Sequence, residues 1–227
     1  MAKINKNRSI NRTNLKRIVS LACVLAVALA ILSASHADGK RHHKKPHESH
    51  VRWDIISINP VPGADGSTIS AGGVATAFAY HTPGNPSAAK ITLSGFGTFI
   101  APASGKEKSK VTGGGTWEAT GDGLPTGSGT YRVTKLVDWQ FANFGSGGPA
   151  FIDEIGDLDE RANGNAVLLI EYDDGSEGML GIGCHGPGAP NGIFEGVIAT
   201  KDYVTYWNGE LPVGNVDANR TIFHVQR

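Results

Sequence analysis

The sequence predicts an all-β protein whose main part folds as a single antiparallel β-barrel, mostly up-and-down, of about 8–10 short strands. Glycine provides 31 of the 227 residues, and Gly, Pro, Asn and Asp separate short runs rich in β-branched and aromatic residues. No window shows a sustained period near 3.6 residues, so helix is at most a minor component. Short loops join most successive strands, which favours pairing between neighbours. A β-sandwich is the alternative architecture.

Ten segments carry the strand pattern. In chain order they are residues 53–58, 73–82, 90–100, 111–120, 130–142, 166–173, 177–184, 193–200, 203–207 and 221–226. The longest interruption, 143–165, is expected to be a loop that caps one end of the barrel.

Two of these segments have strong local patterns. In 130–142 the odd-numbered positions are mostly apolar, which predicts one packed and one wet face, with Lys135 an exception inside and Leu136 an exception outside. Residues 173–176 read Asp-Asp-Gly-Ser between two strands. Asp-Gly is the preferred centre of a type I′ turn, so this segment predicts a β-hairpin.

The first 37 residues carry an export signal. Six basic residues and no acidic one accompany an uncharged run of 15 residues, 18–32, and Ser35-His36-Ala37 suits a cut after Ala37. At about 1.5 Å per residue the run reaches ~22 Å, short of the ~30 Å hydrocarbon core, so the mature form is expected to have no membrane span. Residues 38–52 are almost devoid of apolar side chains, which predicts a disordered tail before one domain, 53–227.

Charge and cysteine content argue against a nucleic-acid-binding protein and against a fold held together by intrachain disulfides. Removing six of the 21 basic residues and none of the 21 acidic ones with the signal leaves a net charge of −6. A nucleic-acid partner would require clustered lysine and arginine instead. Cys184 is the single cysteine beyond the signal, so the mature chain forms no intrachain disulfide. His185 beside it could activate a nucleophile, but Cys184 shares the parity of Leu180 and Ile182 and is expected to be an inert core thiol.

Gly127-Ser128-Gly129-Thr130-Tyr131 leads into the long amphipathic strand, and a late meander of strands follows. In this pattern the chain resembles secreted calycin-like barrels, meaning lipocalins, dirigent proteins and barrels of the allene-oxide-cyclase type, over residues 90–207. The Gly-x-Trp near the first strand of many lipocalins is absent there, and Gly115-Thr116-Trp117 occurs mid-chain instead. No catalytic residue of those families has a counterpart in this sequence. The resemblance implies a central cavity and no more.

Glu195 and His224 are the candidate catalytic residues. Glu195 shares a strand face with Ile193 and Val197, and His224 shares one with Ile222. A carboxylate on an apolar face must be paired, protonated or turned toward a ligand, because an isolated buried charge is prohibitively costly. If both strands line one barrel, the two side chains can meet as an acid/base pair or a ligand clamp. The alternatives are a structural Glu–His or Glu–Arg pair, and an apolar face that is the outer one.

Further candidates come from aromatic and metal-ligating side chains. The candidate ligand-binding residues, whose alternative role is core packing or a solvated turn, are Trp139, Tyr206, Trp207 and His81. No cofactor is predicted. Two runs have the chemistry of metal ligands, and each is more often simply solvated. They are Asp153, Asp157 and Asp159 for Ca²⁺, and His42, His43, His47 and His50 for a transition metal.

The sequence therefore favours an exported protein, secreted or periplasmic, that binds a small, largely apolar molecule or an envelope component. An isomerase- or cyclase-type enzyme that uses a barrel cavity with Glu195 and His224 is the second hypothesis. A structural or stress-related secreted protein without a pocket is the third. A cavity of ~300–1,000 Å³ would favour the first two, and a filled interior the third.

Overall fold

The computed structural model of the chain describes residues 48–61, 66–80, 89–101, 110–148, 150–212 and 219–226. The expected signal peptide, residues 38–47 of the expected tail and His81 lie outside them. Within the described residues the first strand begins at Ser49, four residues before the expected start of the domain. The strands are β1 (Ser49–Pro60), β2 (Gly66–Ala71), β3 (Ala75–Phe78), β4 (Lys90–Leu93), β5 (Phe96–Ala101), β6 (Val111–Thr120), β7 (Gly127–Phe144), β8 (Ala150–Asp153), β9 (Arg161–Tyr172), β10 (Glu177–Cys184), β11 (Gly196–Lys201), β12 (Val204–Tyr206), β13 (Asn208–Gly209) and β14 (Arg220–Gln226).

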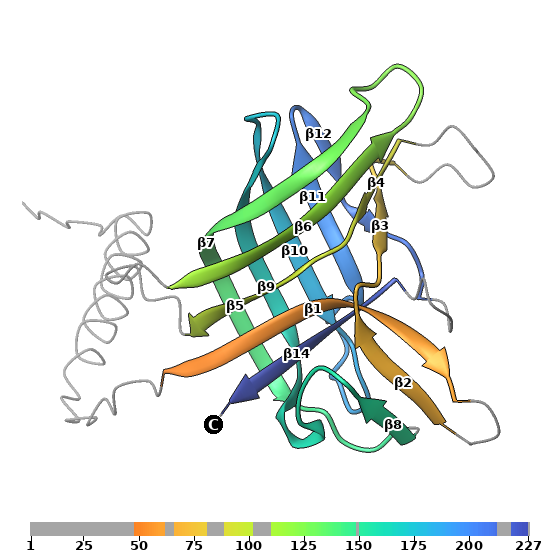
Figure 1. Cartoon of the computed structure of the whole chain (residues 1–227), viewed down its shortest axis with the longest axis vertical. Helices are drawn as coiled ribbons and strands as arrows, with labels where there is room; N and C mark the ends of the chain where they lie inside the picture. The colour runs from red at the N-terminus through yellow and green to blue at the C-terminus, as the bar shows by residue number, and fades with distance from the viewer. Residues whose placement is uncertain are drawn as a thin grey trace, which may run out of the picture. The chain divides into compact units, whose positions relative to one another are not determined.

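Six strands close into a barrel in the order β1, β5, β6, β7, β9, β14 and back to β1. Every neighbouring pair in this ring is antiparallel. The first and last strands complete the ring, and they lie side by side in Figure 1. Trp53 of β1 faces Phe223 on β14 and Gly97 on β5. The prediction of an all-β antiparallel barrel is confirmed.

The remaining strands extend this ring. β10, β11 and β12 continue from β9, while β4, β3 and β13 continue from β6. β2 forms a hairpin with the second half of β1 and pairs in parallel with β8 (Figure 1). Segment 143–165 is therefore not a simple loop. It holds the end of β7, all of β8, the short 3-10 helix η2 (Leu158–Glu160) and the start of β9. The parallel β2–β8 pair is also a departure from up-and-down order.

The long strand β7 contains β-bulges that change which side chains point inward. Its pairing with β9 shifts register between Val133 and Lys135 and again between Leu136 and Asp138. As a result Leu136 is buried, while Lys135 and Val137 are exposed. The expected placement of Lys135 inside and Leu136 outside is wrong, because each bulge inserts one residue and inverts the alternation beyond it.

The hairpin between β9 and β10 is confirmed, but its turn is not type I′. Tyr172 N–H donates to Ser176 O at 2.9 Å, and Gly175 N–H donates to Tyr172 O at 3.0 Å. Gly175 has φ +84°, whereas Asp174 does not have a positive φ. A type I′ turn requires positive φ at both central residues, so the four-residue loop here uses glycine alone for the left-handed position.

Side chains fill the barrel interior. The largest fully buried ones include Trp53, Phe99, Tyr172, Tyr206 and Phe223. A second apolar cluster, which we call the outer layer, lies on the other face of β1 and β14 beneath β2 and β8. It consists of Ile56, Ile58, Ile69 and Ile222, with Phe151 and Ile155 packed against them. β1 is thus buried on both faces between the barrel core and the outer layer.

Candidate functional site

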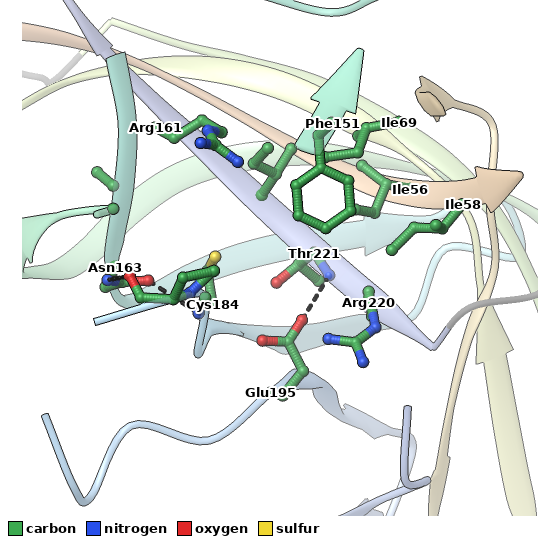
Figure 2. A pocket seen from close by; sticks show the side chains of 15 residues that line it. Ile56, Ile58, Ile69, Phe151, Arg161, Asn163, Cys184, Glu195, Arg220 and Thr221 are labelled. Atoms are coloured by element: carbon green, nitrogen blue, oxygen red, sulfur yellow. Dashed lines mark hydrogen bonds between the residues drawn. The ribbon is translucent and has the colours of Figure 1, made fainter. Parts of the chain in front are cut away.

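A cavity of about 60 Å³, here the outer pocket, lies between the outer layer and the adjoining ends of β9 and β10. One wall is apolar and is made by Ile56, Ile58, Ile69, Phe151 and Ile222. Polar side chains from four segments of the chain complete the lining (Figure 2). They are Arg161, Asn163, Cys184, Glu195, Arg220 and Thr221. The pocket is therefore amphipathic and lies outside the barrel core.

Glu195 is held at the edge of this pocket by backbone donors. Its Oε1 accepts a hydrogen bond from the N–H of Thr221 at 2.9 Å, and its Oε2 accepts one from the N–H of His185. Gly196, with φ +96°, turns the chain directly after it and starts β11. This turn breaks the alternation, so Val197 packs in the barrel core while Glu195 lines the pocket. Burial raises the pKa of Glu195, against the opposing effect of its two backbone hydrogen bonds.

Arg220 brings to the same pocket a guanidinium whose Nε is unsatisfied. It begins β14, opposite Ile56 in the β1–β14 pair. Its Nε is buried and has no hydrogen-bond partner. In Figure 2 the guanidinium extends on the side of Glu195, and its charge helps to lower the pKa of that carboxyl. No ion pair joins the two among the described residues, because the nearest N–O approach exceeds the 4.0 Å limit for a salt bridge.

Arg161 closes the far side of the pocket. Its Nε donates to the backbone oxygen of Leu158 at 3.2 Å, which fixes the side chain at the start of β9. Its guanidinium carbon lies 5.8 Å from the ring centroid of Phe151, a cation–π contact. Arg161 and Arg220 thus place two cationic groups at the boundary between the polar and apolar walls.

An amide network stiffens the rest of the polar wall. Asn163 Oδ1 accepts from the N–H of Gly186 at 2.8 Å, and its Nδ2 donates to Asn143 Oδ1 at 2.8 Å. Cys184 is 5% exposed, and burial raises the pKa of its thiol far above the ordinary value. Cys184 is buried in the core cluster, as expected, and a raised thiol pKa disfavours the nucleophilic thiolate.

His224 does not join Glu195. Its Nε2 lies 3.1 Å from Asp153 Oδ2, and both side chains are almost fully buried. Asp153 Oδ1 accepts from the N–H groups of Ile155 and Gly156. Burial alone would raise the pKa of Asp153, but the hydrogen bonds from His224 and the two backbone groups together lower it. The structure therefore assigns His224 to a buried pair that ties β14 to the end of β8.

Of the four side chains expected to contact a ligand, the three that the structure describes are not brought together. Trp139 packs edge-on between Phe99 and Phe223, at centroid distances of 5.4 and 4.7 Å. Tyr206 is buried in the barrel core, and Trp207 is 59% exposed on the surface. None of these three lines the outer pocket. The fourth, His81, lies outside the described residues.

The candidate metal ligands that lie among the described residues are not brought together either. Asp153 is engaged by His224 and by backbone donors, while Asp157 and Asp159 are exposed. His50 is exposed at the start of β1, and the other three tract histidines lie outside the described residues. Within the part of the chain that the structure describes, no three metal-ligating side chains lie close enough to hold an ion.

The sequence gives little indication that three of the pocket residues belong to a site. Phe151 and Arg161 fall in segment 143–165, which reads as a loop. Arg220 directly precedes the strand pattern of β14. If the alternation of β14 is extended by one residue toward the N-terminus, Arg220 falls on the same strand face as Ile222. This pattern could have indicated that Arg220 lies near the pocket.

No family model matches the chain, no curated protein is similar to it, and no solved structure matches it. Among the described residues there is no helix with the length and apolar character needed to cross a membrane.

Proposed function

We propose that this protein is exported and binds a small, largely apolar ligand in the outer pocket rather than in the centre of its barrel. One observation carries the proposal: the wall formed by Ile56, Ile58, Ile69, Phe151 and Ile222 faces a cavity next to polar groups of opposite charge. Ligand sites are typically concave and largely apolar, with a few polar groups that orient the ligand. Large side chains buried in the barrel core, such as Trp53, Phe99 and Phe223, favour this pocket over the central site that the calycin-like resemblance implies.

The size of the pocket limits the ligand. Its volume of about 60 Å³ is well below the ~300–1,000 Å³ of sites for drug-sized molecules. The pocket therefore suits a short aliphatic molecule, or the end of a longer one whose remainder stays outside.

The enzyme hypothesis receives less support. Glu195 and His224 have separate partners, so the acid/base pair that would have carried it is not assembled. Both oxygens of Glu195 already accept backbone hydrogen bonds, which suits a fixed structural or orienting group. A structural protein without a ligand remains the rival, and binding measurements separate it from the proposal.

A titration with hexan-1-ol, followed by ¹⁵N–¹H correlation spectra of the chain without residues 1–37, tests ligand binding. Saturable shifts should cluster at Ile58, Ile69 and Arg220. Ile58→Trp fills the pocket and should abolish them. The matched control is Ile152→Trp on β8, since Ile152 is 57% exposed and outside the pocket. Shifts that do not saturate, or that survive in Ile58→Trp, would reject the pocket as a ligand site.

Export is tested separately by the mass of the protein recovered outside the cytoplasm of its own host. The residue pattern at 35–37 predicts a mature chain that begins at Asp38. Recovery with Met1 intact would reject cleavage. A native mass spectrum of the same sample would report any ligand that the protein retains.

A further inference from the structure

The outer pocket holds an excess of positive charge. Of the side chains that line it, three are charged: Arg161, Glu195 and Arg220. With Glu195 ionised, these three groups leave one net positive charge beside an apolar wall. Such a charge is costly to keep partly buried unless a counter-charge neutralises it.

Arg220 is the group whose bonding is incomplete. A guanidinium has five N–H donors in a planar fork that matches a carboxylate. The side chain of Arg220 makes no hydrogen bond or ion pair with any described residue, and its Nε is buried. Arg161, by comparison, uses its Nε on Leu158 O. A buried donor without a partner is destabilising, so a ligand that brings a hydrogen-bond acceptor to the Nε of Arg220 would be favoured in this pocket.

Glu195 does not fill this role. Each of its oxygens is oriented by a backbone N–H, from Thr221 and His185, and no ion pair forms with Arg220. The glutamate therefore offsets part of the local charge but leaves the Nε of Arg220 without an acceptor. A monoanion would bring the three pocket charges to balance, whereas a dianion such as a phosphate monoester would exceed it.

We propose that the ligand of the outer pocket is a carboxylic acid with a short apolar chain, bound as a monoanion. Its carboxylate accepts hydrogen bonds from Arg220, and its chain packs on Ile58, Ile69 and Phe151. This inference rests on the function proposed above and adds the chemical class of the ligand. Arg220 and the apolar residues line the same pocket, and in Figure 2 the guanidinium points toward Glu195 and away from Ile58, Ile69 and Phe151. This arrangement sets the order of head group and chain.

The test compares three ligands with the same six-carbon chain: hexanoate, hexan-1-ol and hexyl phosphate. Affinities are measured at pH 7 by ¹⁵N–¹H spectra on the chain without residues 1–37. Wild-type protein should bind hexanoate at least about tenfold more tightly than hexan-1-ol, because hydrogen bonds to a charged partner are worth ~1.5–3 kcal/mol. It should also bind hexanoate more tightly than hexyl phosphate. Arg220→Gln should abolish the preference for hexanoate and leave hexan-1-ol binding within about twofold.

The control is Arg132→Gln, since Arg132 is exposed on β7 and paired with Glu171 far from the pocket residues. This variant should keep the full preference for hexanoate. If Arg220→Gln does not fold, Arg220→Lys keeps the charge but loses the planar fork, and should lose most of the preference.

The outcomes separate the two proposals. If neither hexanoate nor hexan-1-ol binds, the proposed function fails and this inference fails with it. If both bind with equal affinity, the pocket binds apolar ligands and only the carboxylate is rejected. Tighter binding of hexyl phosphate than of hexanoate overturns the proposal that the ligand is a monoanion. A preference that survives in Arg220→Gln overturns the role of Arg220.

Discussion

His224 Nε2 and Asp153 Oδ2 lie 3.1 Å apart, and this contact joins the last strand of the barrel to the end of β8. Gly156 lies so close to the imidazole that a Cβ at this position would come within 2.7 Å of the ring, which explains the glycine. Because β8 also carries Phe151, the same contact positions one wall of the outer pocket. The pair thus links the stability of the outer layer to the geometry of the site.

Asp153→Asn should destabilise the protein. The substitution keeps one oxygen for the backbone donors but replaces the charged acceptor of His224, and hydrogen bonds to charged groups contribute about 1.5–3 kcal/mol. We expect a loss of ~2 kcal/mol, equivalent to a fall in Tm of about 4–8 °C for a domain of this size. Calorimetry or circular dichroism melts measure it. Asp157→Asn, at an exposed position four residues along, is the control and should leave Tm unchanged.

The stability contribution of Asp153 should depend on pH in a defined direction. Its pKa is lowered in the folded state by His224 and two backbone groups, so the unfolded chain binds more protons near and below pH ~4. Stability from this group is complete above the unfolded pKa of about 3.9 and is lost as pH falls through the folded pKa. Urea unfolding at several pH values should show a constant gap between wild type and Asp153→Asn above pH ~5 that narrows below ~4. A gap that widens in acid would contradict the assignment.

Local sequence signals predicted the parts of the fold that local pairing determines. Strands 111–120 and 177–184 and the hairpin at 173–176 follow from alternation and from an Asp-Gly turn, and the structure has them. The parallel pairing of β2 with β8 joins residues about 80 positions apart. Nothing in either short segment specifies a partner at that distance, so the outer layer was missed.

The sequence predicted only part of the candidate site, again because long-range pairing is not readable from it. Glu195 stood out because it carries a charge in an apolar run, and it does line the pocket. Its face was predicted wrongly, since Gly196 has φ +96° and ends the alternation that joined Glu195 to Val197. His224 was equally conspicuous, but its partner Asp153 lies on β8, whose position depends on the long-range pairing that the sequence does not show.

Glu195→Gln should destabilise the protein modestly, contrary to what a buried charge without partners would predict. Both carboxylate oxygens accept backbone hydrogen bonds, and a glutamine can offer only one acceptor oxygen. One N–H, of Thr221 or His185, then loses its acceptor, at a cost of about 1–3 kcal/mol. Removal of a charge whose pKa burial raises offsets part of this, so we expect a net loss of ~1 kcal/mol. Glu177→Gln, at the exposed first position of β10, is the control, and a higher Tm for Glu195→Gln would refute the explanation.

Two N-terminal deletions should have different effects, because β1 begins inside the segment expected to be a disordered tail. A chain that starts at Glu48 keeps all of β1 and should melt like the chain that starts at Asp38, since residues 38–47 are polar and have little apolar surface to bury.

A chain that starts at Trp53 loses Val51, which is fully buried, and Arg52, which is paired with Asp54 at 2.8 Å. Asp54 is fully buried, and burial raises its pKa against the opposing effect of Arg52. The Arg52 side chain is 40% exposed, so solvent screens part of its attraction to Asp54, but its loss leaves the buried Asp54 without its hydrogen-bond donor. A buried group left unpaired costs about 1–3 kcal/mol, which predicts a fall in Tm of at least ~2 °C. Equal Tm values for the two deletions would show that the first four residues of β1 contribute nothing to the barrel. Restoring residues 49–52 alone to the shorter chain should recover the lost stability.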